Sequence, residues 1–592
     1  MVARKGAGPG GGAPSVAVAL DGWRWTIGCW EEVAGAGRRS RVAVGTAPGE
    51  RRTAAGGARR PSRTWPWVLA WLGAAAATAV LVRLPGPAVV DPDEHAAALY
   101  LDRLSHGQRL EDPLLSTPKP LLTLVHGLAW AAVHDWRLLT ALTVAAFALA
   151  VVGLARAAGR LGGPPAAWAT AVALLGWGAI VLQVARGNSV VWAIAGWAVA
   201  ADALTRRERR WGVAAAALLL AALARSETWL LLPPAAAWGA LAWRRGERGA
   251  WLLLVPLAAP LLWLGHDLLL TGDPFYSLGV PERYTNLVAG RHPIHPADWL
   301  TLVGRRYARS PLLCALALAG VWWLARHRAW LWLAGLAVLV PGVLTLLGFE
   351  AARGTYVSWR YYDPADLGVR LAAALGAAWL ATTLASRLRR AGGGSPPRPG
   401  GSPPRPGGRL PGAGGGAVRL RPDGRGAAVL REAAVLRGAG GGAGVAAAVA
   451  AVALVGVACW PLAPADPVVA STLDRDTRLG ANTAAAVRLL RPVAAQPGTV
   501  VAVSGPQRVR VALELGVPLG RVRDLYLATL AGPLDQALAG TAAVFHDADG
   551  DRPAERFAPL SVTRPARVGT VTVVPLRADP GRSLYVLRVD EP

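Results

Sequence analysis

Long apolar segments rich in Ala, Leu, Val and Trp alternate with short polar segments along most of this chain. Many of them approach the about 20 residues that an α-helix needs to cross about 30 Å of hydrocarbon. The pattern therefore predicts a polytopic α-helical membrane protein with about 10–12 spans. The apolar runs lie at about 65–84, 120–134, 138–155, 166–183, 189–204, 211–224, 228–243, 251–270, 311–325, 329–348, 367–386 and 443–462.

Arginine clusters between the apolar runs predict which loops face the cytoplasm. Such clusters lie at 206–210, 244–248 and 387–390. Because cytoplasmic loops carry an excess of Lys and Arg, the polar segments beginning at Asp91, Thr271 and Glu350 are predicted to lie outside. Between 120 and 204, strict alternation gives one crossing too many. One run there is therefore predicted to be re-entrant, interfacial or fused with its neighbour.

Shifts in composition divide the chain into five parts. Residues 1–64 are rich in Gly, Ala and Arg and are predicted to form a disordered basic cytoplasmic tail. The multi-span membrane domain follows at 65–386, and a Gly/Pro/Arg-rich cytoplasmic linker at 387–442. A final transmembrane helix at 443–462 then leads to an extracytoplasmic domain at 463–592.

The C-terminal part reads as a small α/β unit. Apolar segments at 499–503 and 542–545 are typical of buried strands, and those at 568–576 and 583–589 are typical of closing strands. Residues 508–515 have the pattern of a helix. This part contains neither a Gly-rich phosphate loop nor a nucleophile elbow, so the sequence places the chemistry in the membrane domain.

Composition and charge narrow the class of partner. The chain has 592 residues, of which 53% are hydrophobic, and a formal net charge of +26. Because the arginines fall in short clusters between apolar runs, they are typical of loops at a lipid bilayer, and no nucleic-acid partner is predicted. The few cysteines lie far apart, which excludes a disulfide framework and a metal-binding spacing. The predicted location is the plasma membrane.

An acidic pentapeptide, Asp91-Pro92-Asp93-Glu94-His95, follows the first apolar run. Its position suggests chemistry at the membrane surface, since three carboxylates stand where a span ends. Two other readings stay open. The carboxylates could cap a helix that runs from about His95 to Ser105, or Asp91 and Asp93 could bind a divalent metal beside a phosphate. No other cofactor is predicted.

Further polar side chains recur at later boundaries that are predicted to lie outside. A carboxylate can take the proton from an acceptor hydroxyl, while cationic side chains hold and stabilise a departing lipid phosphate. The arginines also have a simpler reading as interfacial anchors or members of an aromatic belt. The candidates for substrate binding are Lys119, Arg137, Arg186, Asn188, Arg360 and Tyr361.

The order of several short motifs resembles the GT-C superfamily of membrane glycosyltransferases, especially the protein-mannosyltransferase and aminoarabinose-transferase type. The resemblance covers roughly residues 65 to 386. Two departures are Asn188, which stands where the motif has aspartate, and the Ala-rich continuation after His95. The motifs are Asp93-Glu94, Pro118-Lys119-Pro120-Leu121-Leu122, Arg137 in His134-Asp135-Trp136-Arg137, Ala185-Arg186-Gly187-Asn188, Leu223-Ala224-Arg225-Ser226-Glu227 and Gly272-Asp273-Pro274-Phe275-Tyr276.

The resemblance implies a hexosyl- or pentosyltransferase that moves a sugar from a polyprenyl-phosphate carrier to an acceptor on the outer face, with inversion at the anomeric carbon. By motif position, Asp93 is the candidate base, and Glu94 and Asp91 are the alternatives. The resemblance also implies that Arg137, Arg186, Arg360 and Lys119 hold the lipid phosphate. The acceptor, an envelope glycan, lipid or protein, is not specified.

Two other classes of function fit the same pattern. Many spans with arginines at their outer ends could line the path of a transporter or flippase for an envelope precursor. A non-catalytic membrane scaffold whose external domain recruits partners is the third alternative. Sugar transfer would support the glycosyltransferase, and uptake without turnover would support the transporter. The absence of both activities would support the scaffold.

Overall fold

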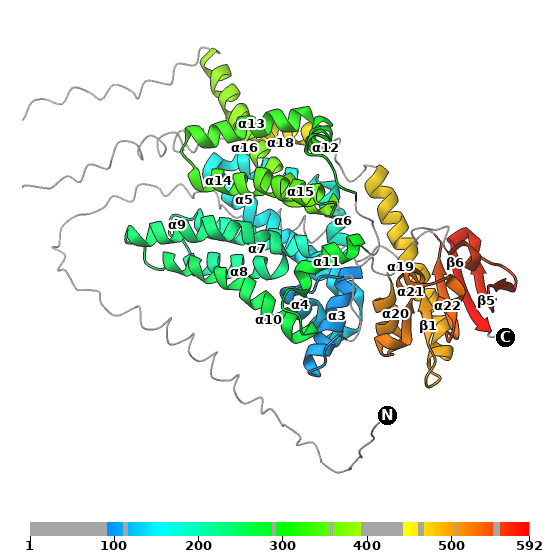
Figure 1. Ribbon diagram of the computed structural model, residues 1–592. Helices are drawn as coiled ribbons and strands as arrows, with labels where there is room; N and C mark the ends of the chain where they lie inside the picture. The colour runs from blue at the N-terminus through cyan, green and yellow to red at the C-terminus, as the bar shows by residue number, and fades with distance from the viewer. Residues whose placement is uncertain are drawn as a thin grey trace, which may run out of the picture. The chain divides into compact units, whose positions relative to one another are not determined.

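The computed structural model describes residues 92–110, 116–286, 292–355, 357, 359–391, 442–459, 467–504, 507–548 and 557–590 (Figure 1). All of them belong to one unit of the chain, Thr64–Pro592. The predicted basic tail, the first apolar run, Asp91 and the linker beyond 391 lie outside the described residues.

The described residues between 92 and 391 are helical wherever they are regular. From position 120 onward the apolar runs that the sequence predicts are helical. The helices are α3 (Pro92–Ser105), α4 (Pro120–Val133), α5 (Trp136–Leu175), α6 (Gly178–Ala185), α7 (Ser189–Leu204), α8 (Trp211–Ala224), η3 (Ser226–Leu231), α9 (Leu232–Arg244), η4 (Ala250–Ala258), α10 (Ala259–Thr271), α11 (Tyr276–Tyr284), α12 (Pro296–Ala308), α13 (Pro311–Arg326), α14 (Trp330–Ala337), η6 (Val338–Gly342), α15 (Val343–Ala352), η7 (Trp359–Tyr362) and α16 (Asp363–Ala391). Helices α11 and α12 lie outside the apolar runs, in the segment beginning at Thr271 that was predicted to be a polar loop.

Four helical segments within the described residues are long and apolar enough to cross a membrane. Two more result if each of two bent helix pairs counts as one span. This composition is that of a membrane-embedded protein, while the total of about 10–12 spans stays a prediction. The four are Trp136–Leu175, Ala250–Thr271, Trp330–Ala352 and Arg360–Leu388, and three shorter apolar helices are Pro120–Val133, Trp211–Ala224 and Val445–Ala458.

The predicted irregularity between 120 and 204 lies at two breaks. Within α5, Gly163 has a φ of 76° and precedes two prolines, so the helix kinks there. The run predicted at 166–183 is thereby divided between α5 and α6. Helices α6 and α7 then meet at an angle of 113°, as in a broken span or a re-entrant loop. The left-handed Gly187 (φ 74°) makes this turn, and the Asn188 side chain caps α7.

The membrane helices pack closely through small residues and turn large ones outward. A Cβ atom at Gly320 of α13 would lie 1.9 Å from the Ala372 carbonyl oxygen of α16, so only glycine allows this approach. On α10, by contrast, Leu261 and Leu269 are 70% and 68% exposed. Apolar side chains on the outside are expected of helices that face lipid rather than water.

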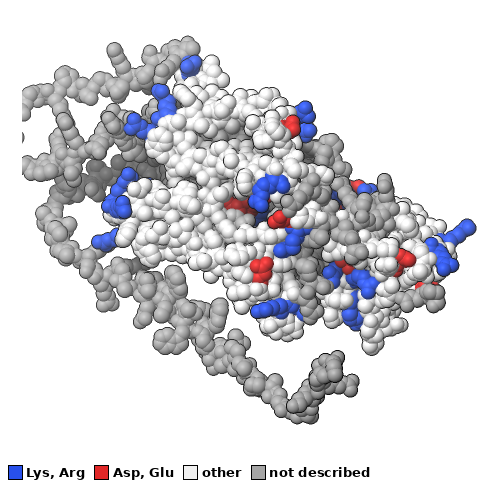
Figure 2. All heavy atoms as spheres, in the orientation of Figure 1, with Lys and Arg blue, Asp and Glu red and all other residues white. Residues whose placement is uncertain are grey.

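The distribution of charge fits the predicted loops. Figure 2 shows that the helical part is mostly white on this face, with blue side chains at the helix ends on the left and mixed blue and red side chains in the centre. The arginine clusters at 206–210 and 244–248 adjoin, because Arg209 Nη1 lies 2.5 Å from Glu247 Oε1. Both loops therefore lie at the same end of their helices, as the sequence predicts.

After α18 (Gly442–Cys459) and α19 (Pro467–Ala494), the chain forms a domain around a six-stranded sheet in the order β2-β1-β3-β6-β5-β4. Strands β1, β2 and β3 are parallel, and the remaining pairs are antiparallel. The predicted segments at 499–503, 542–545, 568–576 and 583–589 overlap β1, β3, β5 and β6, and the predicted helix is α20. The elements are β1 (Val501–Val503), α20 (Arg508–Leu515), η9 (Leu519–Arg521), β2 (Val522–Asp524), α21 (Leu525–Ala531), α22 (Leu534–Leu538), β3 (Ala543–Asp547), η10 (Ala558–Leu560), β4 (Ala566–Val568), β5 (Val571–Asp579), η11 (Pro580–Arg582) and β6 (Leu584–Asp590).

Candidate active site

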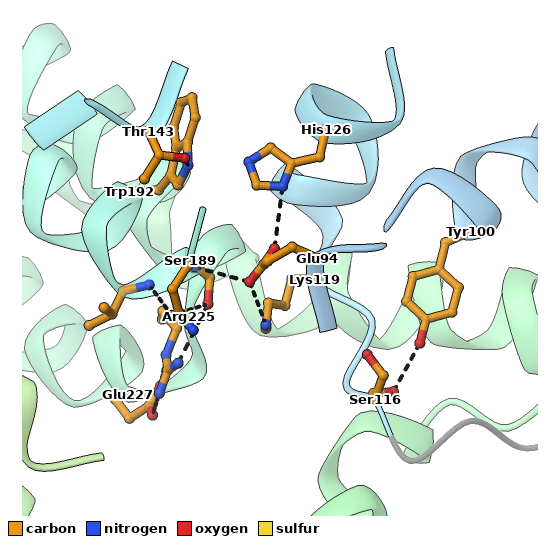
Figure 3. Close-up of polar contacts among 12 residues, drawn as sticks. Glu94, Tyr100, Ser116, Lys119, His126, Thr143, Ser189, Trp192, Arg225 and Glu227 are labelled. Atoms are coloured by element: carbon orange, nitrogen blue, oxygen red, sulfur yellow. Dashed lines mark hydrogen bonds and ion pairs between the residues drawn. The ribbon is translucent and has the colours of Figure 1, made fainter. Parts of the chain in front are cut away.

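Several donors converge on the fully buried carboxylate of Glu94 (Figure 3). Its Oε1 accepts a hydrogen bond from Lys119 Nζ at 3.1 Å and another from the Ser189 backbone N–H at 3.2 Å. Its Oε2 lies 3.3 Å from His126 Nδ1. Taking a carboxylate out of water costs several kcal/mol unless charge and hydrogen bonds compensate it. Glu94 is therefore held in a polar centre among apolar helices.

Local sequence explains why these groups meet. Lys119 immediately precedes Pro120, which restricts it to the extended conformation observed (φ −120°, ψ 108°) and makes it the N-cap of α4. Ser189 is the first residue of α7, so its backbone N–H is one of the donors that a helix leaves without an internal partner. Since the N-terminal end of a helix attracts anions, the bend before α7 favours the Glu94 carboxylate.

A second charged pair lies beside the first, at the turn between α8 and η3. Arg225 Nε donates to Glu227 Oε2 at 3.0 Å, and Arg225 Nη1 lies 3.5 Å from the Ser189 hydroxyl oxygen. Burial by itself would raise the pKa of the Glu227 carboxyl, but the Arg225 charge and hydrogen bond lower it below its ordinary value of 4.5. Ser189 thus links the pairs: its N–H contacts Glu94 and its hydroxyl contacts Arg225 (Figure 3).

Tyr361, in the short helix η7 before α16, also lies beside this cluster. Its ring lies 5.7 Å from the guanidinium of Arg225 and 5.8 Å from that of Arg360, measured from ring centre to Cζ. Cations over an aromatic face gain about 0.5–2 kcal/mol. The structure therefore brings four of the predicted side chains into one region. They are Glu94, Lys119, Arg360 and Tyr361.

The remaining predicted residues have other surroundings or no described side chain. Asp93 lies in the first turn of α3, but only its backbone is described, and Asp91 is outside the described residues. Asn188 is fully buried, and its side-chain oxygen accepts from the Val190 N–H at 3.0 Å. Arg137 is exposed in the first turn of α5. Each of these roles in catalysis or binding stays a prediction.

Arg186 contacts the C-terminal part of the chain. Its Nε and Nη2 atoms lie 2.7 and 2.5 Å from Oδ2 of Asp476, a residue of α19. The carboxylate offsets the arginine charge at the bend between α6 and α7. The sequence alone contains no signal that these two residues, far apart in the chain, are partners.

Sequence reasoning missed His126 and the roles of Ser189 and Arg225. His126 is fully buried in α4, and its ring lies edge-on to Trp192 at 5.8 Å. A signal was available for the histidine, because an ionisable side chain inside an apolar run is costly and is usually retained for a function. Arg225 lies in one of the motifs that the sequence singled out, Leu223–Glu227, but no role was assigned to it. Ser189 carried no comparable signal, since small residues are common at helix ends.

A third polar group lies at the start of α16. Asp363 is fully buried, and Gln183 of α6 donates to its Oδ2 at 3.3 Å. One turn further, Asp366 lies 2.5 Å from Arg306 Nη2 and accepts from the Tyr307 hydroxyl at 3.0 Å. These contacts hold α16 against α6 and α12, and so fix the helix that follows Tyr361.

Comparison with known proteins gives structural similarity only. No protein-family model and no curated protein matches the chain. Among solved structures it is similar to ArnT from Cupriavidus metallidurans, apo (14% identity, TM-score 0.46) and bound to undecaprenyl phosphate (14%, 0.47), each alignment covering 89% of this chain and 98% of the other. It is also similar to the oligosaccharyltransferase of Archaeoglobus fulgidus in the apo form, with 12% identity and a TM-score of 0.43. That alignment covers 83% of this chain and 72% of the other.

ArnT and the Archaeoglobus enzyme are GT-C glycosyltransferases, the group that the sequence motifs resemble. The TM-scores lie below 0.5 and the identities are 12–14%, so these similarities do not assign a reaction to this chain. A reaction has to be inferred from the residues of the chain itself.

The residue after Glu94 makes stability depend on pH. Burial lowers the pKa of His95 well below 6.5, and the charge of Arg510 lowers it further. Below pH 6.5 the unfolded chain therefore binds a proton that the folded protein does not, and stability falls by up to about 1.4 kcal/mol per pH unit. We expect His95→Gln to remove this component. Thermal unfolding in detergent from pH 7.5 to 5 measures how the stability of wild type and of His95→Gln changes with pH. The same change with pH in the two proteins would contradict the assignment to His95.

Proposed function

We propose that this protein is a membrane glycosyltransferase that moves a sugar from a polyprenyl-phosphate carrier to an envelope acceptor. The observation that carries the proposal is the buried Glu94–Lys119 pair, joined through Ser189 to the Arg225–Glu227 pair. Buried ion pairs contribute little to stability compared with apolar side chains of similar size. Two such pairs at the ends of apolar helices are therefore better explained by a charged ligand that arrives from the membrane.

The cluster is suited to a phosphate on a lipid. Lys119 and Arg225 supply cationic hydrogen-bond donors. The guanidinium of Arg360, beside Tyr361, is a third positive charge. Glu94 and Glu227 hold the first two cations in place in the low-dielectric surroundings, where electrostatic stabilisation of a leaving phosphate is strongest. The flanking apolar helices would accommodate the polyprenyl tail.

In the proposed reaction, the Asp93 carboxylate takes the proton from an acceptor hydroxyl. The hydroxyl oxygen then attacks the anomeric carbon, and the bond from that carbon to the phosphate oxygen breaks. The polyprenyl phosphate leaves with the electron pair, stabilised by Lys119, Arg225 and Arg360. A single displacement of this kind inverts the anomeric centre. We propose that it takes place on the outer face, with the C-terminal domain also outside.

The proposal leaves open a divalent ion beside the donor phosphate. Among the residues that the structure describes, no three His, Cys, Asp or Glu side chains are grouped as metal ligands. The segment Asp91-Pro92-Asp93 contributes no described side chains. A loss of activity with EDTA that Mg²⁺ or Mn²⁺ restores would show that the reaction uses a divalent ion.

A second candidate function is transport of an envelope precursor. It is favoured by Asp363 and Arg370, which are fully or almost fully buried within the candidate span Arg360–Leu388. Ionisable side chains inside a span often mark a substrate or proton path. Arg370, however, donates to the Ala173 carbonyl oxygen at 3.0 Å and stacks on Trp177, which a structural role explains.

One assay separates the functions. The purified protein in liposomes receives a polyprenyl-phospho-sugar labelled in the sugar, and a cell-envelope extract serves as acceptor. We expect label to move from the lipid to the extract and free polyprenyl phosphate to form in equal amount. Movement of the intact labelled lipid between leaflets without cleavage would support the transporter instead. If the protein neither transfers the sugar nor moves the lipid, the scaffold is supported.

A further inference from the structure

The C-terminal domain contacts the helix that carries the predicted catalytic carboxylates. We propose that its helices α19 and α20 are a positioning element of the active site, which holds α3 and the bend before α7 in their working geometry. This inference rests on the proposed function for its kinetic consequence, but its structural consequence can be measured separately.

Helix α3 lies between two hydrophobic cores. Ala96, Leu99 and Tyr100 lie on one face, at the spacing of a helix, and belong to the same hydrophobic core as Val487 of α19 and Val511 of α20. Ala97, on another face, belongs to the core of the membrane helices. Because α3 is not among the apolar helices that could span a membrane, the C-terminal domain supplies the cover for its apolar face.

A chain of side-chain contacts connects α3 to α20 through Trp136, the first residue of α5. The ring of His95, next to Glu94, meets the ring of Trp136 edge-on at 4.5 Å. The Trp136 indole N–H donates to Glu514 Oε1 at 3.0 Å, and Arg510 Nε lies 2.7 Å from the same oxygen. His95 is buried and Arg510 nearly so. A buried, hydrogen-bonded arrangement of this kind restricts the rotamers of its members, and through His95 it restricts the first turns of α3.

The second connection lies on α19. Asp476 pairs with Arg186, which stands immediately before the turn at Gly187 and two residues before Asn188. That turn presents the Ser189 N–H to Glu94 and the Ser189 hydroxyl to Arg225. The C-terminal domain therefore contacts α3 and the bend that leads into α7, whose first residue meets Glu94.

Placement of this kind affects rate more than binding. A displacement of about 1 Å in a catalytic group can lower the rate by about 10²-fold, whereas the donor phosphate and its lipid tail are held mainly by the membrane helices. Weakening the contact with α20 is therefore expected to lower kcat and to leave KM for the donor nearly unchanged. It should also loosen α3 whether or not substrate is present.

The test uses the full chain and breaks the same hydrogen bond from either side. Trp136→Phe keeps the ring against His95 and removes the indole N–H, while Glu514→Ala removes the acceptor. Glu514→Gln retains an acceptor oxygen, and Asp590→Asn alters an exposed ion pair of β6 in the same domain. Initial rates of sugar transfer and hydrogen–deuterium exchange of the α3 amides are measured for all four variants.

We expect Trp136→Phe and Glu514→Ala to lower kcat about 10-fold, to change donor KM less than about 3-fold, and to speed exchange in α3 about 10-fold. Asp590→Asn should stay near wild type in both measurements. Glu514→Gln keeps an acceptor for the Trp136 N–H but loses the charge beside the buried Arg510, so both of its effects should be smaller than those of Glu514→Ala. Unchanged kcat and unchanged exchange in α3 for the first two variants would overturn the positioning role, as would a rise in donor KM that accounts for the whole loss.

Failure of the proposed function gives a different result. If the wild-type protein transfers no sugar while Trp136→Phe and Glu514→Ala still speed exchange in α3, the docking of the C-terminal domain on α3 stands and the reaction does not. If the wild-type protein transfers sugar and the exchange rates do not change, the reaction stands and the positioning role does not.

Discussion

Asp93→Asn is expected to lower kcat for sugar transfer by about 10²–10⁴-fold, the contribution that a general base makes in other enzymes. Asparagine is similar in size but cannot accept the proton of the acceptor hydroxyl at neutral pH. Because the residue lies in the first turn of α3, the change should leave the fold intact. Initial rates at saturating donor measure the loss, and KM for the donor should stay within about 3-fold of wild type.

Helix α3 offers a matched control. Asp102 is exposed on the same helix, and its side chain retains 56% of its accessible surface. Asp102→Asn removes one carboxylate from α3 without touching the site, so its rate should equal that of wild type. Full activity of Asp93→Asn, or an equal loss in Asp102→Asn, would contradict the role of Asp93 as the base. Asp91 and Glu94 would then be the carboxylates to test.

Glu94→Gln is expected to have the second largest effect, in stability as well as in rate. Removing one charge of a buried pair leaves the other without compensation and costs about 3–5 kcal/mol. Here the buried Lys119 ammonium loses its carboxylate partner, and His126 loses the carboxylate 3.3 Å away. The variant should unfold at a markedly lower temperature in detergent and should transfer sugar slowly where it remains folded.

A double variant separates the structural effect from the catalytic one. Glu94→Gln combined with Lys119→Met removes both charges, so much of the lost stability should return. Sugar transfer should not return, because Lys119 is a proposed ligand of the donor phosphate. Recovery of both stability and activity would show that the pair is only structural. Thermal unfolding and transfer rates of the two single variants and the double variant complete the cycle.

The sequence predicted part of the site because some of its members have local signatures. Glu94 and Lys119 are recognisable from the acidic segment after an apolar run and from a lysine between two prolines. Their contact could not be predicted, since it depends on how α3, α4 and α7 pack. Arg186 was predicted as a ligand of the lipid phosphate, and that role stays a prediction. The structure adds a partner that the sequence did not indicate, Asp476 of α19.

The fold was predictable to a similar degree. Apolar runs identified the helices from 120 onward except α11 and α12, which lie in the predicted polar segment beginning at Thr271, and the alternation of short apolar segments identified β1, β3, β5 and β6. Strands β2 and β4, each three residues long, were too short to produce a pattern. The division of the run at 166–183 between α5 and α6 was also missed, although Gly163-Pro164-Pro165 is a recognisable point of interruption.

By itself, the sequence determined that this chain is built from apolar helices and a small α/β domain, because hydrophobic periodicity and run length follow from local residue order. It also determined which polar side chains lie near the ends of those helices. Only the tertiary structure decided which of them meet. Glu94 gains Lys119, His126 and Ser189 as partners, and α3 gains α20 as its support, because these contacts join residues that packing, not sequence neighbourhood, brings together.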